Sequence, residues 1–378
     1  TQKTAYEIMP SLVGSEMCIR DRFEIANRIG VSEAVRMASA YSDEAGLELP
    51  EWFSDRQESF DFSYIDVSIQ NGIASVRINR PEAMNALNVT VVSQLGDALD
   101  KLNIRDDVTA IALEGAGKAF VAGADVKFFV DKIRAGVIAD IYDFTAHGHA
   151  VLDKLESSPK TTIALTTGLA LGGGLELALA CDYRVGTRRT QFRFPETGIG
   201  IYPGLGGTQR TPRICGVECA RYAVLAGNFL DASSAKALGL LTHLVDPSAV
   251  EATLAEIVSH GKPGEKYLNR PTDPDNPIVA FATSFYSDGN ISSLLAGSLP
   301  DEFDIEDKMV SRQLKSLSRA APIALSMASD LLDIATRSDM ESGLESELEG
   351  LDRIFSTSDA LEGLSALIEG RRPEYSGS

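Results

Sequence analysis

Apolar residues occupy every second position in residues 65–69 and again in 74–78, and Asn71-Gly72 lies between the two runs. A period of two is typical of strands with one buried face. Both residues of an Asn-Gly turn tolerate positive φ, so this dipeptide favours a tight turn between paired strands. The pattern therefore predicts a β-hairpin.

Helical and strand periods alternate beyond this hairpin. Apolar residues fall at helical spacing in 92–102, and residues 108–113 form a short apolar run typical of a buried strand. A helix is expected to end at 153–157 before Pro159, followed by a strand over 161–167 and an apolar helix over 174–180. This order predicts an α/β fold with crossover connections.

The flanking regions have different patterns. Residues 23–60 show helical spacing and are expected to form a helical extension, followed by a core over 61–260. The segment 261–306 contains a stretch, 262–300, that is rich in Pro, Gly, Asp and Ser, and it is predicted to be an irregular insertion. Helical periodicity returns over 307–369, so residues 307–378 are expected to form a C-terminal helical region that stops at Gly370.

The composition restricts the possible partners. The chain has 54 acidic and 35 basic residues, a net charge of -19, which disfavours nucleic acid because phosphate binding requires clustered Lys and Arg. No apolar run reaches the roughly 18 residues of a membrane span. The N-terminus has no secretory pattern, so no membrane association and a cytoplasmic location are expected.

Four cysteines lack the spacing of a metal site, and reduced buried thiols are expected instead: Cys18, Cys181, Cys215 and Cys219. His147 and His149 do not lie one helical turn apart, and His243 and His260 have no acidic or cysteine neighbours at ligand spacing. We therefore expect no metal and assign the four histidines to core or surface roles.

The beginning of the chain is unusual. Residues 13–22 (VGSEMCIRDR) resemble an in-frame translation of a sequencing-library adapter, so residues 1–22 are expected to be an artefact or disordered and are left out of the fold argument. Residues 23–58 resemble the closing part of a 3-hydroxyacyl-CoA dehydrogenase C-terminal domain. An ordinary helical extension is an equal alternative.

Residues 168–182 (GLALGGGLELALACD) place three glycines between a predicted strand and a predicted helix. Free backbone N–H groups at a helix N-terminus favour developing negative charge, which suits an oxyanion site. The spacing does not match the GxGxxG pattern of dinucleotide-binding folds. Tight packing of the helix on the strand would account for one glycine, but hardly for three.

Two further loops carry candidate chemistry. Residues 117–129 (GKAFVAGADVKFF) form a small-residue loop before a helix, with Asp125 in the first turn, and could be an ordinary connection. Residues 194–210 (FPETGIGIYPGLGGTQR) contain five glycines and two prolines, with Glu196 near the start of a long uncharged run. Such surroundings indicate a partly desolvated carboxyl group suited to proton transfer.

Together these three motifs, in this order and spacing, resemble the enoyl-CoA hydratase/isomerase family, also called crotonases. The resemblance is strong over residues 62–245 and looser over 307–375. It implies a crotonase-like ββα spiral with a C-terminal helical region. It also implies an acyl-CoA substrate, no cofactor, and assembly as a homotrimer or a dimer of trimers.

The resemblance assigns the family's two oxyanion amides to Ala124 and Gly173, and the two glutamates of its hydratases to Glu176 and Glu196. A retained pair favours reversible addition of water to a trans-2-enoyl-CoA, giving a 3-hydroxyacyl-CoA. We assign proton donation to the α-carbon to Glu196 and the role of base to Glu176, although coupled titration blurs this division. The alternatives are a Δ3-Δ2-enoyl-CoA isomerase, which uses one glutamate, and a non-catalytic acyl-CoA-binding module.

By the same resemblance, the CoA substrate is expected to pass along residues 80–87 and the loop 122–127. In the final segment, where relatives often offer a lysine near the adenine, this chain has Glu369 and Gly370 followed by two arginines. The candidate substrate-binding residues are Arg80, Ala83, Ala86, Ala122, Gly123, Asp125, Val126, Lys127, Gly172, Pro203 and Gly204.

Overall fold

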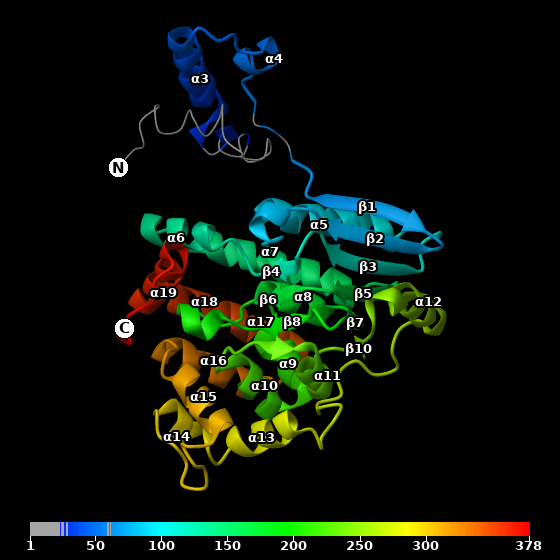
Figure 1. The fold of residues 1–378 in the computed structure, drawn as a ribbon, viewed down its shortest axis with the longest axis vertical. Coiled ribbons are helices and arrows are strands. Elements are labelled where there is room, and N and C mark those ends of the chain that lie inside the picture. Colours follow the sequence, from blue (N-terminus) through cyan, green and yellow to red (C-terminus); the bar gives the residue numbers. More distant parts are fainter. Residues whose placement is uncertain (1–22, 24–25, 28, 59, 61) are drawn as a thin grey trace. The chain divides into compact units, whose positions relative to one another are not determined.

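A computed structural model describes residues 23, 26–27, 29–58, 60 and 62–378 of the chain. The chain divides into two compact units, Thr1–Ser63 and Tyr64–Ser378, and Figure 1 labels their elements. The expectation for residues 1–22 lies outside the described residues.

The first unit contains α3 (Val31–Ala45) and the short α4 (Glu51–Ser54). Met37 and Ala38 of α3 are buried and pack against apolar side chains that include Phe53 of α4. Gly46 ends α3 in the left-handed conformation. The region thus contains helices, and its resemblance to a dehydrogenase domain remains a prediction.

The second unit begins with the predicted hairpin. Strands β1 (Ile65–Gln70) and β2 (Ile73–Ile78) pair antiparallel, and Asn71 and Gly72 at the turn have φ of 51° and 79°. Left-handed values at both turn residues match the right-handed twist of the strands, so the turn closes the pair without splaying it.

Two sheets form the centre of the second unit. One has the order β1-β2-β3-β5-β7-β10 and the other the order β4-β6-β8-β9. Strands β3 to β8 alternate between the two sheets along the chain, which is the predicted spiral of strand–strand–helix units. The remaining strands are β3 (Ala110–Gly115), β4 (Ala119–Ala122), β5 (Thr161–Thr166), β6 (Leu169–Leu171), β7 (Tyr183–Gly186), β8 (Gln191–Arg193), β9 (Leu230–Asp231) and β10 (His243–Leu244).

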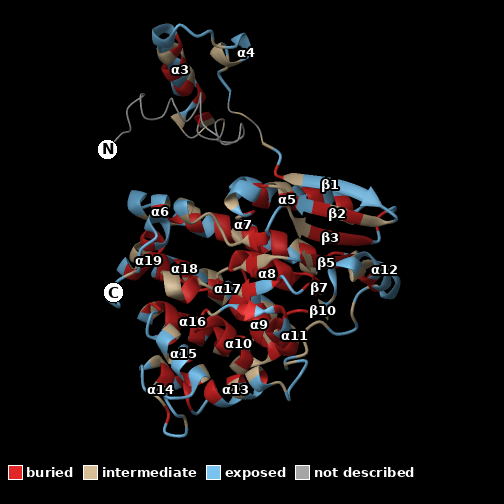
Figure 2. Ribbon diagram, viewed as in Figure 1, coloured by how far each residue is buried: buried red, intermediate tan, exposed pale blue. Residues whose placement is uncertain are grey.

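Helices cover and separate these sheets, and Figure 2 shows buried residues concentrated between the layers. All eight residues of α8 are buried, which explains why this helix has apolar residues on every side. The helices of this part are α5 (Val89–Asn103), α6 (Val126–Ala135), α7 (Ala139–Glu156), α8 (Gly173–Ala180), α9 (Gly207–Cys215), α10 (Val217–Val224), α11 (Ala232–Leu238) and α12 (Val250–His260), with short 3-10 helices η1 (Pro81–Ala83), η2 (Glu196–Ile199) and η3 (Pro247–Ala249).

The stretch 262–300 is only partly irregular, because it contains α13 (Pro277–Phe285) and α14 (Ile291–Leu295). Asn276 caps α13 by accepting a hydrogen bond from the Ile278 N–H, and Pro277 fits the first helical position. The many Pro, Asp and Ser residues nearby concealed this start signal in the sequence.

The C-terminal region is helical, as predicted. Gly370 ends its last helix in the left-handed conformation, with φ of 68°. The helices are α15 (Lys308–Leu317), α16 (Pro322–Ile334), α17 (Met340–Glu349), α18 (Leu351–Phe355) and α19 (Ser358–Glu369).

Candidate active site

The second sheet brings the three sequence motifs together. Strands β4, β6 and β8 are parallel neighbours, with Ala122 paired to Leu171 and Leu171 paired to Arg193. Because the carboxyl ends of parallel neighbours lie at one edge of a sheet, the loops that follow these three strands meet there. The three motifs therefore form one site although they are spread over almost a hundred residues.

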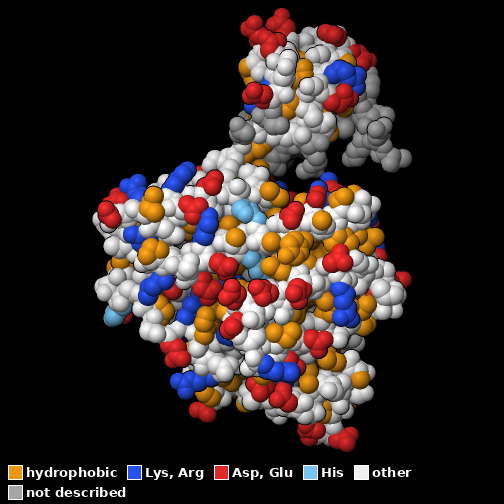
Figure 3. All heavy atoms as spheres, turned by 180° about the vertical axis from the view of Figure 1, so that it is seen from behind, with side chains coloured by type: hydrophobic (Ala, Val, Ile, Leu, Met, Phe, Trp, Pro, Cys, Tyr) orange, Lys and Arg blue, Asp and Glu red, His pale blue; other side chains and the backbone are white. Residues whose placement is uncertain are grey.

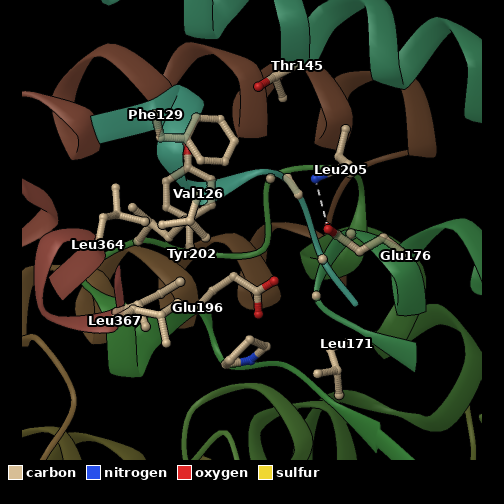
Figure 4. Close-up of a pocket in the computed structure, with 18 of the residues that line it drawn as sticks. Val126, Phe129, Thr145, Leu171, Glu176, Glu196, Tyr202, Leu205, Leu364 and Leu367 are labelled. Carbon is tan, nitrogen blue, oxygen red and sulfur yellow. Dashed lines mark hydrogen bonds between the residues drawn. The ribbon is translucent and has the colours of Figure 1, made fainter. Parts of the chain in front are cut away.

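A cavity of about 270 Å³ lies at this edge. Figure 4 shows Glu176 and Glu196 pointing into it among apolar side chains. Helices α18 and α19 of the C-terminal region also contribute to its wall. The lining residues are Met84, Ala122, Gly123, Ala124, Val126, Phe129, Phe144, Thr145, Leu171, Gly172, Gly173, Glu176, Arg193, Pro195, Glu196, Ile199, Ile201, Tyr202, Gly204, Leu205, Leu351, Phe355, Leu364 and Leu367.

The Glu176 carboxyl group is held by the backbone. One oxygen, Oε1, accepts hydrogen bonds from the N–H groups of Leu205 and Gly207, each at 2.7 Å. Burial raises the pKa of Glu176 to about 8, and the nearby charge of Glu347 adds to this shift, while the two amides oppose it. Glu176 is thus fixed in one orientation and can carry a proton near neutral pH.

The Glu196 carboxyl group has different surroundings. It lies in the first turn of η2, is 7% exposed, and its Oε2 accepts no hydrogen bond from any residue that the structure describes. Burial raises the pKa of Glu196 well above the usual value, and the negative charge of Glu176 raises it further, while Arg193 opposes the rise. An unpartnered buried carboxyl oxygen is costly unless a ligand or a proton satisfies it.

Each glycine of the triplet has its own role. Gly172 has φ of 48°, and a Cβ there would lie 2.2 Å from Glu196 Oε1. A Cβ on Gly174 would lie 2.0 Å from the Val121 carbonyl oxygen, so this glycine allows α8 to pack on β4. Tight packing therefore explains Gly174, as the sequence argument allowed, but it does not explain Gly172.

Ala124 and Gly173 both line the cavity. Gly173 is the first residue of α8, where a backbone N–H has no partner within its own helix. The preceding Gly123 has φ of 80°, which turns the chain before Ala124. These placements suit the predicted oxyanion amides, whose catalytic role remains a proposal.

The candidate substrate-binding residues divide into two groups. Five of them line the cavity: Ala122, Gly123, Val126, Gly172 and Gly204. The other six lie outside its lining: Arg80, Ala83, Ala86, Asp125, Lys127 and Pro203.

Acidic side chains are spread over the face shown in Figure 3, with lysine and arginine side chains between them. The two candidate cations of the substrate site, Arg80 and Lys127, differ in exposure. Lys127 is exposed, whereas Arg80 is only 8% exposed. The Arg80 guanidinium donates to the Ala86 carbonyl at 3.3 Å and lies 3.4 Å from Asp125, which is the N-cap residue of α6 rather than part of its first turn. Arg80 thus braces two loops of the site.

Several residues of the site escaped the sequence argument. The apolar positions of 307–369 predicted helices, but nothing in their spacing indicated that Leu364 and Leu367 would line a cavity with residues from β6. Glu347 was also missed, because α17 contains other glutamates that are exposed. His149 lies in the core and contacts Glu347, with 3.3 Å between Nε2 and Oε1.

Among the described residues, no group of three or more His, Cys, Asp or Glu side chains could hold a metal ion. Cys181, Cys215 and Cys219 are buried free thiols, as expected, and Cys18 lies outside the described residues. Within the same described part of the chain, no helix is both long and apolar enough to traverse a membrane.

Comparison with known proteins agrees with this geometry. The family model for enoyl-CoA hydratase/isomerase matches residues 73–377. The chain belongs to this family. The predicted family and fold are thereby confirmed.

Several relatives in this family are hydratases by name. A short-chain-enoyl-CoA hydratase of Clostridium acetobutylicum is 29% identical over 80% of this chain and 93% of its own length. A probable enoyl-CoA hydratase of Mycobacterium bovis is 30% identical over 80% and 94%. A crotonyl-CoA hydratase of Syntrophomonas wolfei is 37% identical over 50% and 74%. An enoyl-CoA hydratase structure from Rhodobacter sphaeroides, 22% identical, has the same fold, with a TM-score of 0.71 over 84% of this chain and 93% of that chain.

Proposed function

We propose that this protein is an enoyl-CoA hydratase, which adds water reversibly to a trans-2-enoyl-CoA and gives a 3-hydroxyacyl-CoA. The observation that carries the proposal is the pair of buried carboxyl groups, Glu176 and Glu196, in one cavity. The hydratase names of the relatives support it. An acyl-CoA substrate and no further cofactor are part of the proposal.

Hydration requires one group that takes a proton from water and one that gives a proton to the α-carbon. Two neighbouring carboxyl groups repel each other's charge, so one can be ionised while the other is protonated. The two amides on Glu176 favour its ionised form, which suits a base. Glu196, whose Oε2 has no partner among the described residues, suits a proton donor.

In the proposed reaction, the thioester carbonyl oxygen accepts hydrogen bonds from the Ala124 and Gly173 N–H groups. These donors stabilise the negative charge that gathers on this oxygen as the water oxygen bonds to the β-carbon. Glu176 takes one proton from the water, and Glu196 delivers a proton to the α-carbon. Transfer of a proton from Glu176 back to Glu196, directly or through solvent, restores the starting state, so the sum is the addition of one water molecule. The reverse path releases it.

The experiment is a hydration assay with crotonyl-CoA. We expect loss of the absorbance of the conjugated thioester, together with a product heavier by one water molecule. An isomerase would instead convert but-3-enoyl-CoA into crotonyl-CoA without a change of mass. If crotonyl-CoA binds but neither reaction occurs, the hydratase proposal is wrong and a non-catalytic binding module is favoured. Assembly as a homotrimer or a dimer of trimers and a cytoplasmic location stay predictions.

A further inference from the structure

The stretch 204–208, which leads into α9, donates hydrogen bonds to two buried carboxyl groups, those of Glu176 and Glu347. The N–H groups on either side of Gly206 hold Glu176, as described above. The Gly206 N–H itself donates to Glu347 Oε1 at 2.5 Å, and the Thr208 hydroxyl donates to the other oxygen of Glu347. Glu347 therefore holds the same short stretch of backbone that fixes Glu176.

Glu347 is an exception on its own helix. Its side chain is fully buried, whereas Glu345 and Glu349 of α17 are exposed. The Nε2 atom of His149 lies 3.3 Å from Glu347 Oε1 and 2.7 Å from the Gly204 carbonyl oxygen. Burial acts to lower the pKa of His149, but the contacts with Glu347 and Gly204 outweigh it and the pKa is raised. His149 and Glu347 thus contact each other, and each also contacts the backbone of the stretch 204–208.

Other polar groups face this network from neighbouring elements. Tyr202 donates from its hydroxyl to the Glu347 backbone oxygen at 2.6 Å. Arg210 donates to the Leu205 carbonyl oxygen at 3.3 Å and is paired with Glu156. The charge of Glu347 raises the pKa of both Glu176 and Glu196. The effect of Glu347 on the pKa of Glu176 exceeds the opposing effect of His149.

We propose that Glu347 is a positioning residue of the reaction, which acts through the backbone of residues 204–208 to hold Glu176 in its working orientation and places a negative charge near the carboxyl pair. This inference rests on the proposed hydratase function. Glu347 does not line the cavity, so it would act without touching the substrate.

The test compares Glu347→Gln with Glu345→Gln, an exposed glutamate on the same helix, in the full-length chain. Glutamine can accept from the Gly206 N–H but carries no charge. We expect kcat for crotonyl-CoA to fall about ten- to a hundredfold in Glu347→Gln, because small displacements of a catalytic group have effects of this size. Binding of the saturated thioester butyryl-CoA should change by less than about twofold. Glu345→Gln should match the wild type.

A pH profile separates this role from simple support of the fold. The charge of Glu347 raises the pKa of Glu176, so its removal should shift the limb of the kcat/KM profile that reports Glu176 to lower pH. A loss of kcat with an unshifted profile would overturn the proposal, as would unchanged kcat and an unchanged profile.

Two results distinguish failure of this inference from failure of the function. If the wild type does not hydrate crotonyl-CoA, the hydratase proposal fails and the inference fails with it. If the wild type is active and Glu347→Gln behaves like it, only the inference fails. Should Glu347→Gln not fold, Thr208→Val removes one donor to Glu347. Lower kcat with unchanged butyryl-CoA binding then supports the proposal, and wild-type kcat overturns it.

Discussion

The two carboxyl groups of the cavity, on α8 and on η2, differ in their hydrogen bonding. Glu176 extends from a fully buried helix and is held by two backbone N–H groups. Glu196 extends from a short 3-10 helix, and its Oε2 has no hydrogen-bond partner within the described part of the chain. Both have raised pKa values, so burial alone does not separate their roles. The difference in hydrogen bonding indicates which one gives up its proton first.

The largest expected effect comes from Glu196→Gln, because glutamine keeps the shape of the side chain but cannot donate the proton. We expect kcat for crotonyl-CoA to fall by about a thousandfold with KM nearly unchanged, within the range typical of a lost general acid. Steady-state kinetics measure both constants. Glu176→Gln should show a similarly severe loss. Turnover like that of the wild type in Glu196→Gln would rule out the mechanism.

A matched pair of glycines tests the orientation of each carboxyl group separately. A Cβ at Gly207 would lie 2.7 Å from Glu176 Oε1, and one at Gly172 would lie 2.2 Å from Glu196 Oε1. Gly207→Ala and Gly172→Ala should each lower kcat about a hundredfold by displacing the neighbouring carboxyl group.

The control is Gly198→Ala, because a Cβ there would meet no atom within 4 Å. It should leave kcat unchanged, and steady-state assays of the three variants make the comparison. If Gly207→Ala were as active as Gly198→Ala, the orientation of Glu176 would not matter for the reaction.

The comparison also explains what could be predicted from the sequence. The hairpin, the alternation of strands and helices, and the positions of Glu176 and Glu196 follow from local signals, which are periodicity, turn residues and glycine-rich loops. The order of strands in a sheet is not a local property. Once β4, β6 and β8 are parallel neighbours, however, the loops that follow them must meet at one edge of the sheet. Resemblance to the family supplied the roles of the residues.

Other parts of the site depend on contacts between segments far apart in the sequence. Glu347 accepts from Gly206, 141 residues away, and an acidic helix gives no local sign that one of its glutamates is buried. The helical spacing that places Leu364 and Leu367 in a helix cannot tell which of them faces a cavity. Local patterns therefore pointed to the motifs that contain Glu176 and Glu196, but not to these residues from distant segments.

Replacing each glutamate by alanine should also affect the free energy of unfolding differently, though by less than the kinetic effects above. Glu176→Ala leaves the N–H groups of Leu205 and Gly207 without their acceptor, whereas Glu196→Ala removes a carboxyl group whose Oε2 has no partner among the described residues. We expect the free energy of unfolding of Glu176→Ala to lie about 1–3 kcal/mol below that of Glu196→Ala, the usual cost of unsatisfied buried donors. Urea denaturation at pH 7 measures the difference, and equal stabilities would contradict it.

The last expected effect is a gradual change in how stability depends on pH. Glu176 has a pKa of about 8 in the folded protein and about 4.5 when unfolded, so the folded state binds this proton more tightly. Its contribution is fully present below pH 4.5 and is lost as pH rises to about 8. One such proton gives a slope of up to about 1.4 kcal/mol per pH unit.

Urea denaturation at pH 5, 6, 7 and 8 should therefore show a smaller loss of stability with rising pH for Glu176→Gln than for the wild type. Removal of Glu176 also removes a charge that raises the pKa of Glu196, so both changes flatten the dependence in the same direction. The exposed Glu345→Gln serves as the control and should keep the wild-type slope. Parallel curves for Glu176→Gln and the wild type would contradict the raised pKa of Glu176.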